Sequence, residues 1–210
     1  MINREKIIAQ YLLQSKAIKL EPANPFTWAS GMHAPIYCDN RKTLSLPEIR
    51  SVIRDEFTKM ISENFVQAEM IAGVATGAIA QGALVADKMN LPFVYVRSEP
   101  KKHGLENLIE GIVVPGKKVV VVEDLISTGG SSLKAVESLR KAGCRVLGLV
   151  AIFSYGFDKA IENFKNANCP FYTLTNYNTL VNCALEINYI NQNELLVLKK
   201  WREDPQNWKP

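Results

Sequence analysis

The sequence predicts an α/β fold with a central, mostly parallel sheet flanked by helices. From residue 69 to residue 153, short apolar segments typical of strands alternate with amphipathic segments typical of helices. Residues 119–122 are four consecutive valines, which indicates a strand buried on both faces. Because alternating strands and helices favour right-handed crossovers between parallel strands, we expect one such sheet.

Two helices are predicted ahead of the first strand of this sheet. The amphipathic stripe of residues 2–18 consists of Ile7, Ile8, Tyr11, Leu12 and Ile18. Residues 45–61 begin with a capping-box pattern of Ser45 and Glu48, and Pro47 lies in the first turn. The stripe of this second helix consists of Ile49, Val52, Ile53, Phe57 and Met60. We expect residues 1–45 to form a small N-terminal hood.

The alternating part of the chain supplies the sheet. Strands are predicted near residues 69–74, 91–96, 119–122 and 145–153, with helices at 78–89 and 131–143. The second of these helices turns Leu133, Val136 and Leu139 inward and ends with Gly143 as its C-cap. A polar stretch covers residues 98–117. Residues 156–210 indicate further α/β structure and a helix at 191–201, without a catalytic pattern.

The composition limits the class of protein. A chain of 210 residues, 47% of them apolar and without repeats or linkers, is expected to form a single domain over residues 1–210. Lysine and arginine exceed aspartate and glutamate by 25 to 21, a surplus too small to indicate a nucleic-acid partner. No uninterrupted apolar stretch reaches the length of a membrane span, so we expect a cytoplasmic protein with no membrane partner. The four cysteines lack metal-site spacing and are expected to be reduced thiols.

Two carboxylates, Glu123 and Asp124, end the valine strand, and the small residues 127–132 follow. In open α/β sheets, ligands bind beyond the carboxyl ends of the strands. The backbone N–H groups of a small-residue loop, with a helix N-terminus behind it, suit a phosphate monoester. The carboxylates suit sugar hydroxyls or a hydrated Mg²⁺. A phosphorylated sugar is therefore the predicted ligand. The alternative is an ordinary helix N-terminus with nearby acids, but buried carboxylates without partners would be costly.

Residues 119–132 resemble the phosphoribosyl-pyrophosphate (PRPP) signature of the type I phosphoribosyltransferases: an apolar strand, two acids, two residues, then Ser/Thr and glycines. The resemblance implies the fold of that family, a central sheet flanked by helices with a small N-terminal hood. Residues 111–118 approach a Walker A pattern, but Lys118 stands where Ser or Thr should bind Mg²⁺. We interpret this segment as the turn before the valine strand.

Two further stretches resemble the orotate phosphoribosyltransferases within this family. Residues 96–104 are similar to their mobile catalytic loop through Arg97, Lys101, His103 and Gly104, and we expect this loop over about residues 97–112. Residues 26–41 are similar to the segment that covers the base. Cations in such a loop would stabilise a departing pyrophosphate. The alternative for any basic loop is plain solvation.

The resemblance implies transfer of the 5-phosphoribosyl group from PRPP to orotate, which gives orotidine 5′-monophosphate and pyrophosphate. It implies Mg²⁺ held mainly by PRPP and water with no direct protein ligand, and a homodimer in which Lys101 and His103 act on the neighbouring subunit's site. The implied catalytic residues are Lys101, His103 and Asp124, and Ser127 is implied to contact orotate. The implied PRPP-binding residues are Arg97, Lys101, His103, Glu123, Asp124, Leu125, Ile126, Ser127, Thr128, Gly129, Gly130 and Ser131.

The sequence departs from this family pattern at several cations. Ala29 and Gly77 stand where many members carry lysine, and the loop has fewer basic residues than usual. Lys102 and Arg41 are candidate replacements. Arg41 could pair with the orotate carboxylate, or it could form a structural salt bridge. Residues 73–82 are interpreted as a backbone loop for pyrophosphate, although their glycines could instead permit close helix packing.

Alternatives remain at this point. Tyr37 and Phe26 are candidates to stack on the base, but an aromatic side chain beside proline is more often a packing residue. A type I transferase for a purine base would share the PRPP signature. A PRPP-sensing binding protein would keep the fold, but it should lack the cations of the loop, which this chain retains. A purely structural role fits least well with the acid pair.

Overall fold

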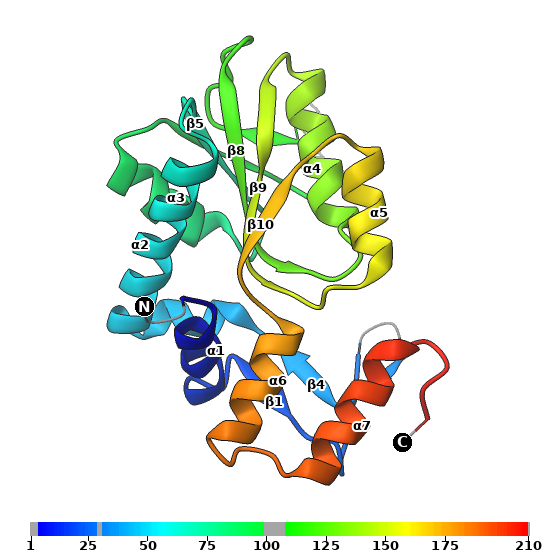
Figure 1. The fold of residues 1–210 in the computed structure, drawn as a ribbon. Coiled ribbons are helices and arrows are strands. Elements are labelled where there is room, and N and C mark those ends of the chain that lie inside the picture. Colours follow the sequence, from blue (N-terminus) through cyan, green and yellow to red (C-terminus); the bar gives the residue numbers. More distant parts are fainter. Residues whose placement is uncertain (1–3, 29–30, 99–107, 210) are drawn as a thin grey trace.

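A computed structural model describes residues 4–28, 31–98 and 108–209. Its centre is a six-stranded sheet with the order β10-β9-β8-β5-β6-β7, in which neighbouring strands are parallel except for the antiparallel β7 (Figure 1). The strands are β5 (Met70–Val74), β6 (Phe93–Val96), β7 (Ile109–Glu110), β8 (Lys118–Ile126), β9 (Arg145–Ser154) and β10 (Phe171–Asn176). The predicted mostly parallel sheet is therefore confirmed.

Four helices cover the two faces of this sheet (Figure 1): α2 (Pro47–Asn64), α3 (Ile79–Met89), α4 (Gly130–Lys141) and α5 (Asp158–Asn166). The valines of β8 alternate between two apolar clusters. Val120 and Val122 pack in the cluster that contains α2 and α3, and Val119 and Val121 pack in the cluster that contains α4 and α5. All four valines are fully buried, as expected for a strand covered on both faces.

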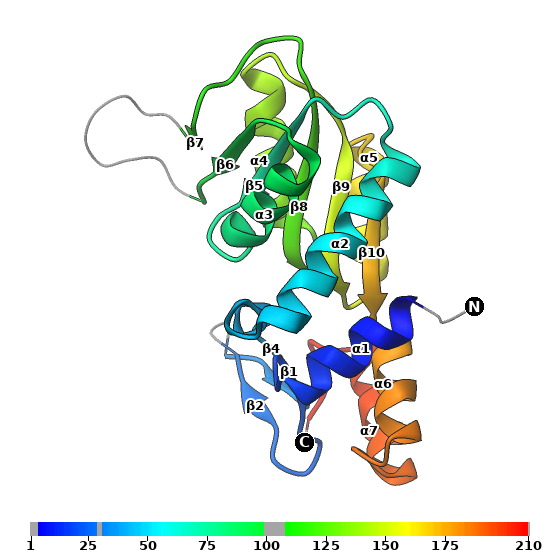
Figure 2. The same cartoon turned by 90° about the vertical axis from the view of Figure 1, so that its left-hand side faces the viewer.

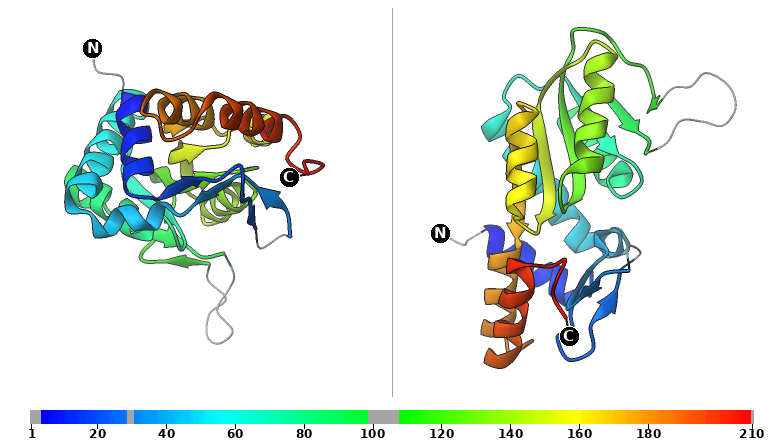
Figure 3. Two further views of the ribbon diagram at one scale, coloured as in Figure 1. Left: turned by 90° about the horizontal axis from the view of Figure 1, so that it is seen from below. Right: turned by 90° about the vertical axis from the view of Figure 1, so that its right-hand side faces the viewer.

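A second layer lies beyond the carboxyl end of β10 and contains both end regions of the chain (Figure 2). We call it the hood layer. It consists of α1 (Arg4–Gln14), the antiparallel pair β1 (Ile18–Leu20) and β4 (Ile36–Cys38), the pair β2 (Phe26–Thr27) and β3 (His33–Ala34), the 3₁₀-helix η1 (Asn40–Ser45), α6 (Tyr177–Glu186) and α7 (Gln192–Glu203). Figure 3 shows α6 and α7 side by side in this layer. The hood layer therefore contains α6 and α7 from the C-terminal part of the chain in addition to the predicted N-terminal residues, and the sequence did not indicate this.

Local boundaries differ from the predictions in three places. Ile18 belongs to β1 because α1 ends at Gln14 and the chain turns at Lys16, whose φ is 54°. The predicted capping box at Ser45 does not form. Ser45 is the last residue of the 3₁₀-helix, and the N-cap position of α2 is held by Leu46 instead. The polar stretch also contains a short strand, β7, which pairs with β6.

Within the described part of the chain, no helix combines the length and the apolar character that crossing a membrane requires.

Candidate active site

A cavity of about 350 Å³ opens where β5 and β8 end. Two segments line it, residues 74–77 from the last residue of β5 onward and residues 123–131 from the last residues of β8 onward. Because β8 runs parallel to β10, and β10 leads directly into α6, the carboxyl ends of these strands face the hood layer (Figure 2). The cavity therefore lies at the edge of the sheet where α/β proteins bind ligands.

The two acids at the end of β8 have different environments. Glu123 is 4% exposed, and its carboxylate accepts a hydrogen bond from Ser132 Oγ at 2.8 Å and one from the Asp124 amide at 3.0 Å. Burial, reinforced by the neighbouring Asp124 carboxylate, raises the pKa of Glu123 well above its usual range. The side chain of Glu123 is thus held inside the protein, with Ser132 as a partner.

Asp124 is half-buried and lines the cavity. Its carboxylate lies directly against Gly77: a Cβ atom at residue 77 would be 2.7 Å from Asp124 Oδ1 and nearer still to Cγ and Oδ2. Its main-chain carbonyl accepts a hydrogen bond from Asn40 Nδ2 at 2.7 Å. Among the residues that the structure describes, no lysine or arginine lies within 4.0 Å of either carboxylate. Neither acid is therefore locked to a cation within the described part of the chain.

Position 77 has no room for a side chain. In this arrangement, the Asp124 carboxylate occupies the volume that any side chain at position 77 would need. The segment before it contains a cis peptide between Ala75 and Thr76, and α3 begins two residues later. A lysine at this position would require a different placement of Asp124.

The loop after β8 has the geometry of an anion-binding site. Gly129 has a φ of 79°, and a Cβ atom there would approach Phe164 Cε2 to 2.6 Å, so this position needs glycine. The Thr128 carbonyl accepts a hydrogen bond from Asn163 Nδ2 at 2.9 Å, which ties the loop to α5. Because α4 begins at Gly130, its first N–H groups and its dipole face the cavity side of the loop.

The structure brings nearly all predicted residues of the 123–131 segment to the cavity. The residues that line it from this segment are Glu123, Asp124, Leu125, Ser127, Thr128, Gly129, Gly130 and Ser131. Ile126 does not line it: its side chain is fully buried, and its carbonyl accepts a hydrogen bond from the Tyr155 amide at 3.1 Å.

The predicted cations are only partly within the described structure. Lys101, Lys102 and His103 lie outside the described residues. Arg97 follows β6 directly, and its Nη1 lies 3.3 Å from Glu110 Oε1 on β7. Arg41 keeps 59% of its side chain exposed, and its Nε lies 2.7 Å from Asp39 Oδ1, which raises the pKa of the guanidinium.

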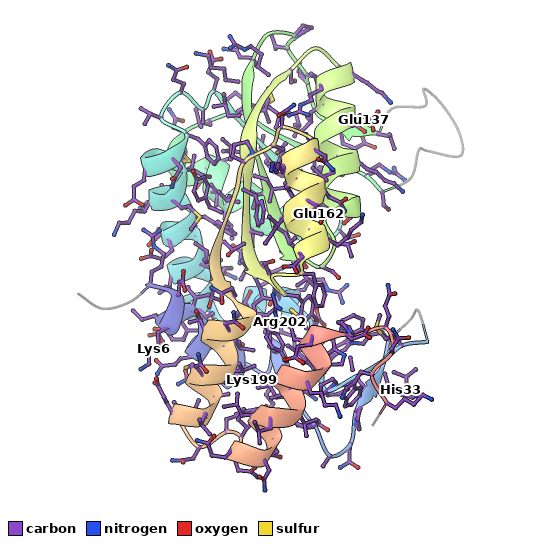
Figure 4. The ribbon with its side chains drawn as sticks, turned by 45° about the vertical axis from the view of Figure 1, so that its right-hand side comes forward. Lys6, His33, Glu137, Glu162, Lys199 and Arg202 are labelled. Atoms are coloured by element: carbon purple, nitrogen blue, oxygen red, sulfur yellow. The ribbon has the colours of Figure 1, made fainter. Side chains whose placement is uncertain are left out.

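The hood residues predicted near the base lie together. The rings of Phe26 and Tyr37 are 5.6 Å apart, and Tyr37 is 40% exposed. His33 lies at the outer edge of the hood layer (Figure 4). Arg202 lies at the end of α7 nearest the sheet, where it donates hydrogen bonds to the carbonyls of Tyr155 (3.1 Å) and Gly156 (Figure 4).

Three residues around the site were not identified from the sequence. Ser132 and Asn40 contact the acid pair, and Arg202 holds the turn after β9. Ser132 is the last residue of the signature stretch 119–132 and stands in the first turn of α4, but its role as the hydrogen-bond partner of Glu123 was not predicted. Asn40 lies 84 residues before Asp124 and Arg202 lies near the C-terminus, so no local spacing connects them to the site.

Comparison with known proteins decides the family. The phosphoribosyl transferase domain matches residues 43–183. Orotate phosphoribosyltransferase from Bacteroides thetaiotaomicron is 62% identical over 208 residues, which cover 99% of this chain and 98% of that protein. The chain belongs to the orotate phosphoribosyltransferase family. Another family member, from Bacillus subtilis, is 53% identical over 203 residues, or 97% of this chain and 94% of that protein.

Solved structures agree with this assignment to the orotate phosphoribosyltransferases. Orotate phosphoribosyltransferase from Aeropyrum pernix has a TM-score of 0.76 at 27% identity, covering 88% of this chain and 99% of that one. Leishmania donovani UMP synthase has a TM-score of 0.80 at 25% identity, covering 95% of this chain and 42% of that one. The predicted type I fold and the predicted transferase class are both confirmed, and the purine-base and sensor alternatives are set aside.

Proposed function

We propose that this enzyme transfers the 5-phosphoribosyl group of PRPP to orotate in the cavity at the end of β8. The observation that carries the proposal is the pairing, in one cavity, of a glycine loop at a helix N-terminus with a half-buried Asp124 that has no cation partner among the described residues. The N–H groups of residues 127–131 bind the 5′-phosphate. Asp124 accepts hydrogen bonds from the ribose hydroxyls.

Glu123 and Asp124 have separate roles in this proposal. Glu123 is held by Ser132 and by the Asp124 amide, so it fixes the end of β8 and completes the floor of the ribose site. Asp124 presents its carboxylate to the cavity and is the acid closest to the segment 74–77. We assign the pyrophosphate to the backbone of that segment, since it lines the same cavity.

The transferred group passes through an oxocarbenium-like state, in which negative charge grows on the departing pyrophosphate. Preorganised cations stabilise such charge most strongly. We assign this role to Arg97, Lys101 and His103 on the basis of the family resemblance. We further propose a homodimer in which Lys101 and His103 serve the neighbouring subunit's site.

The atoms around the cavity that could serve as ligands fit a hydrated Mg²⁺ bound mainly through PRPP. They are oxygen atoms, which Mg²⁺ prefers, and they include one available carboxylate, that of Asp124. Asp124 would hold the waters of the ion. When bound, Mg²⁺ supplies positive charge to the diphosphate. The described residues include no cluster of three potential metal-ligating side chains.

Orotate is assigned to the side of the cavity that faces the hood layer. Ser127 lines the cavity, and Tyr37, with Phe26 beside it, provides an exposed aromatic surface in the hood layer. Arg41 is the candidate partner for the orotate carboxylate, because its side chain remains largely exposed while it contacts Asp39.

We also place the enzyme in the cytoplasm, in keeping with its four free thiols. We treat the sheet and the hood layer as one catalytic domain over residues 1–210, with no nucleic-acid or membrane partner.

The test follows the loss of orotate absorbance with PRPP and Mg²⁺. We expect turnover with orotate and none with uracil, adenine or hypoxanthine. Lys101→Ala and Asp124→Asn should each be nearly inactive, and a mixture of the two should recover part of the activity if the site is shared between subunits. Heterodimer formation is checked by differential tagging. Two inactive variants that form heterodimers without recovery would refute sharing, and a wild type that leaves orotate unchanged would refute the function.

A further inference from the structure

Asn40 connects the hood layer to the acid pair. It is the first residue of η1, it is 2% exposed, and its Nδ2 donates to the Asp124 carbonyl at 2.7 Å. This hydrogen bond joins segments 84 residues apart in the chain. A buried asparagine is uncommon unless its side-chain amide is hydrogen-bonded. The Asp124 carbonyl supplies that hydrogen-bond partner for Asn40.

The main-chain carbonyl of Asp124, which Asn40 binds, lies past the last residue of β8 that pairs with β5. The pairing of β5 with β8 ends at Gly73 and Val122, whereas the pairing of β8 with β9 continues to Ile126. Asp124 therefore stands on a part of β8 that has a strand neighbour on one side only. The Asn40 side chain supplies a hydrogen bond at the open side.

The side chain and the backbone of Asn40 are each held by a hydrogen bond from within residues 38–43. Its Oδ1 accepts a hydrogen bond from the Cys38 thiol at 3.3 Å, and the Thr43 hydroxyl donates to the main-chain carbonyl of Asn40 at 2.6 Å. Burial and the nearby Asp124 carboxylate raise the pKa of the Cys38 thiol well above its usual range, so the thiol remains a donor. A thiol donor on Oδ1 leaves Nδ2 to face Asp124.

We propose that Asn40 is a positioning residue for the reaction: its hydrogen bond to the Asp124 carbonyl keeps the Asp124 carboxylate against Gly77 at the edge of the cavity and couples its placement to the hood layer. The inference rests on the proposed role of Asp124 in ribose binding. Asn40 itself lies behind the strand end and does not line the cavity. Its loss therefore displaces a ligand-binding group without removing that group's charge.

The test compares Asn40→Asp and Asn40→Leu with the wild type through the Kd of PRPP with Mg²⁺, measured by calorimetry, and through kcat and KM. At about pH 8 both variants should bind PRPP about 10- to 100-fold more weakly, the loss expected for a displaced group. The Asp variant should recover affinity relative to the Leu variant as the pH falls, because a protonated carboxyl can again donate to the Asp124 carbonyl.

A matched control separates positioning from general destabilisation. Tyr177 is a buried hood residue whose hydroxyl donates to the Leu198 carbonyl at 2.9 Å, so Tyr177→Phe also leaves a backbone carbonyl without its side-chain donor. It should lower the Tm to a similar extent as Asn40→Leu but keep the Kd of PRPP within about twofold, since it does not contact Asp124.

Three outcomes decide the proposal. Asn40 variants with a lowered Tm and a wild-type Kd for PRPP would overturn it, as would an equal loss of affinity in Tyr177→Phe. Should Asn40→Leu not fold, Cys38→Ala, which frees Oδ1, should weaken PRPP binding while Cys38→Ser restores it, and equal affinity in this pair would count against the proposal. A wild type that binds PRPP but does not consume orotate would refute the proposed function. The role of Asn40 would then be decided by the Kd of PRPP for the variants alone.

Discussion

The substitution Gly77→Ala isolates the placement of the Asp124 carboxylate. The added Cβ would lie 2.7 Å from Oδ1 and closer to the rest of the carboxyl group, whereas ordinary contacts begin at 3.4 Å. The carboxylate must therefore move by about 1 Å or rotate away, and a displacement of this size costs on the order of 100-fold in rate. Gly77 does not have a positive φ, and the atoms in conflict are the free end of a side chain. The free energy of unfolding should thus change by less than about 1 kcal/mol.

The assay measures kcat/KM for PRPP and urea unfolding of the same preparations. We expect kcat/KM to fall about 100-fold at nearly unchanged stability. The matched control is the same substitution in an Asp124→Ala background, where the conflict with the carboxylate is removed and Gly77→Ala should have little further effect on PRPP affinity. A Gly77→Ala enzyme with wild-type kcat/KM would show that the Asp124 carboxylate does not need the position against residue 77.

Three further predictions concern stability. Because burial raises the pKa of Glu123, the folded protein binds this proton more tightly than the unfolded chain, and the free energy of unfolding decreases as the pH rises from about 4 through the folded pKa. Glu123→Gln should therefore gain stability over the wild type as the pH rises through this window, and a difference that is independent of pH in chemical denaturation would contradict the assigned cause. Gly129→Ala should lose at least about 1–2 kcal/mol in urea unfolding from its left-handed backbone alone, with a further loss from contact with Phe164, and unchanged stability would refute the geometry of the loop. Arg202→Met should lose about 1–3 kcal/mol for each carbonyl left unpaired in the turn after β9, whereas the exposed Lys199→Met on the same helix should stay within about 0.5 kcal/mol, and similar Tm values for the two variants would exclude the predicted role of Arg202.

Much of the fold could be predicted because its signals are local. The four valines indicated a doubly covered strand, and the structure divides them between two apolar clusters. Gly143 was expected at the end of α4, and it follows the last helical turn with a φ of 85°. The place of α6 and α7 could not be predicted, because an amphipathic pattern shows that a helix has an apolar face but not which partner that face contacts.

The same distinction applies to the site. The segment from Glu123 to Ser131 was recognisable because one continuous stretch supplies the strand end, the acids and the loop. The burial of Glu123 was not, since it depends on the partner Ser132 and on the packing around the strand end. Asn40 was missed because an asparagine near a turn is common, and its contact with Asp124 exists only after the hood layer and the sheet have come together.

The hood layer combines segments from the N-terminal and C-terminal parts of the chain, and this affects the order in which the protein folds during synthesis. Helix α1 ends at residue 14, but α6, against which it packs, begins at residue 177. A ribosome adds about 5–20 residues per second, so α1 waits on the order of ten seconds for its partner. During that interval the nascent chain can assemble strands β5 to β9 and the loop after β8, while the apolar side of α1 still lacks β10 and α6. The hood layer is thus completed last, and a nascent chain stalled before residue 177 should be a preferred client of chaperones.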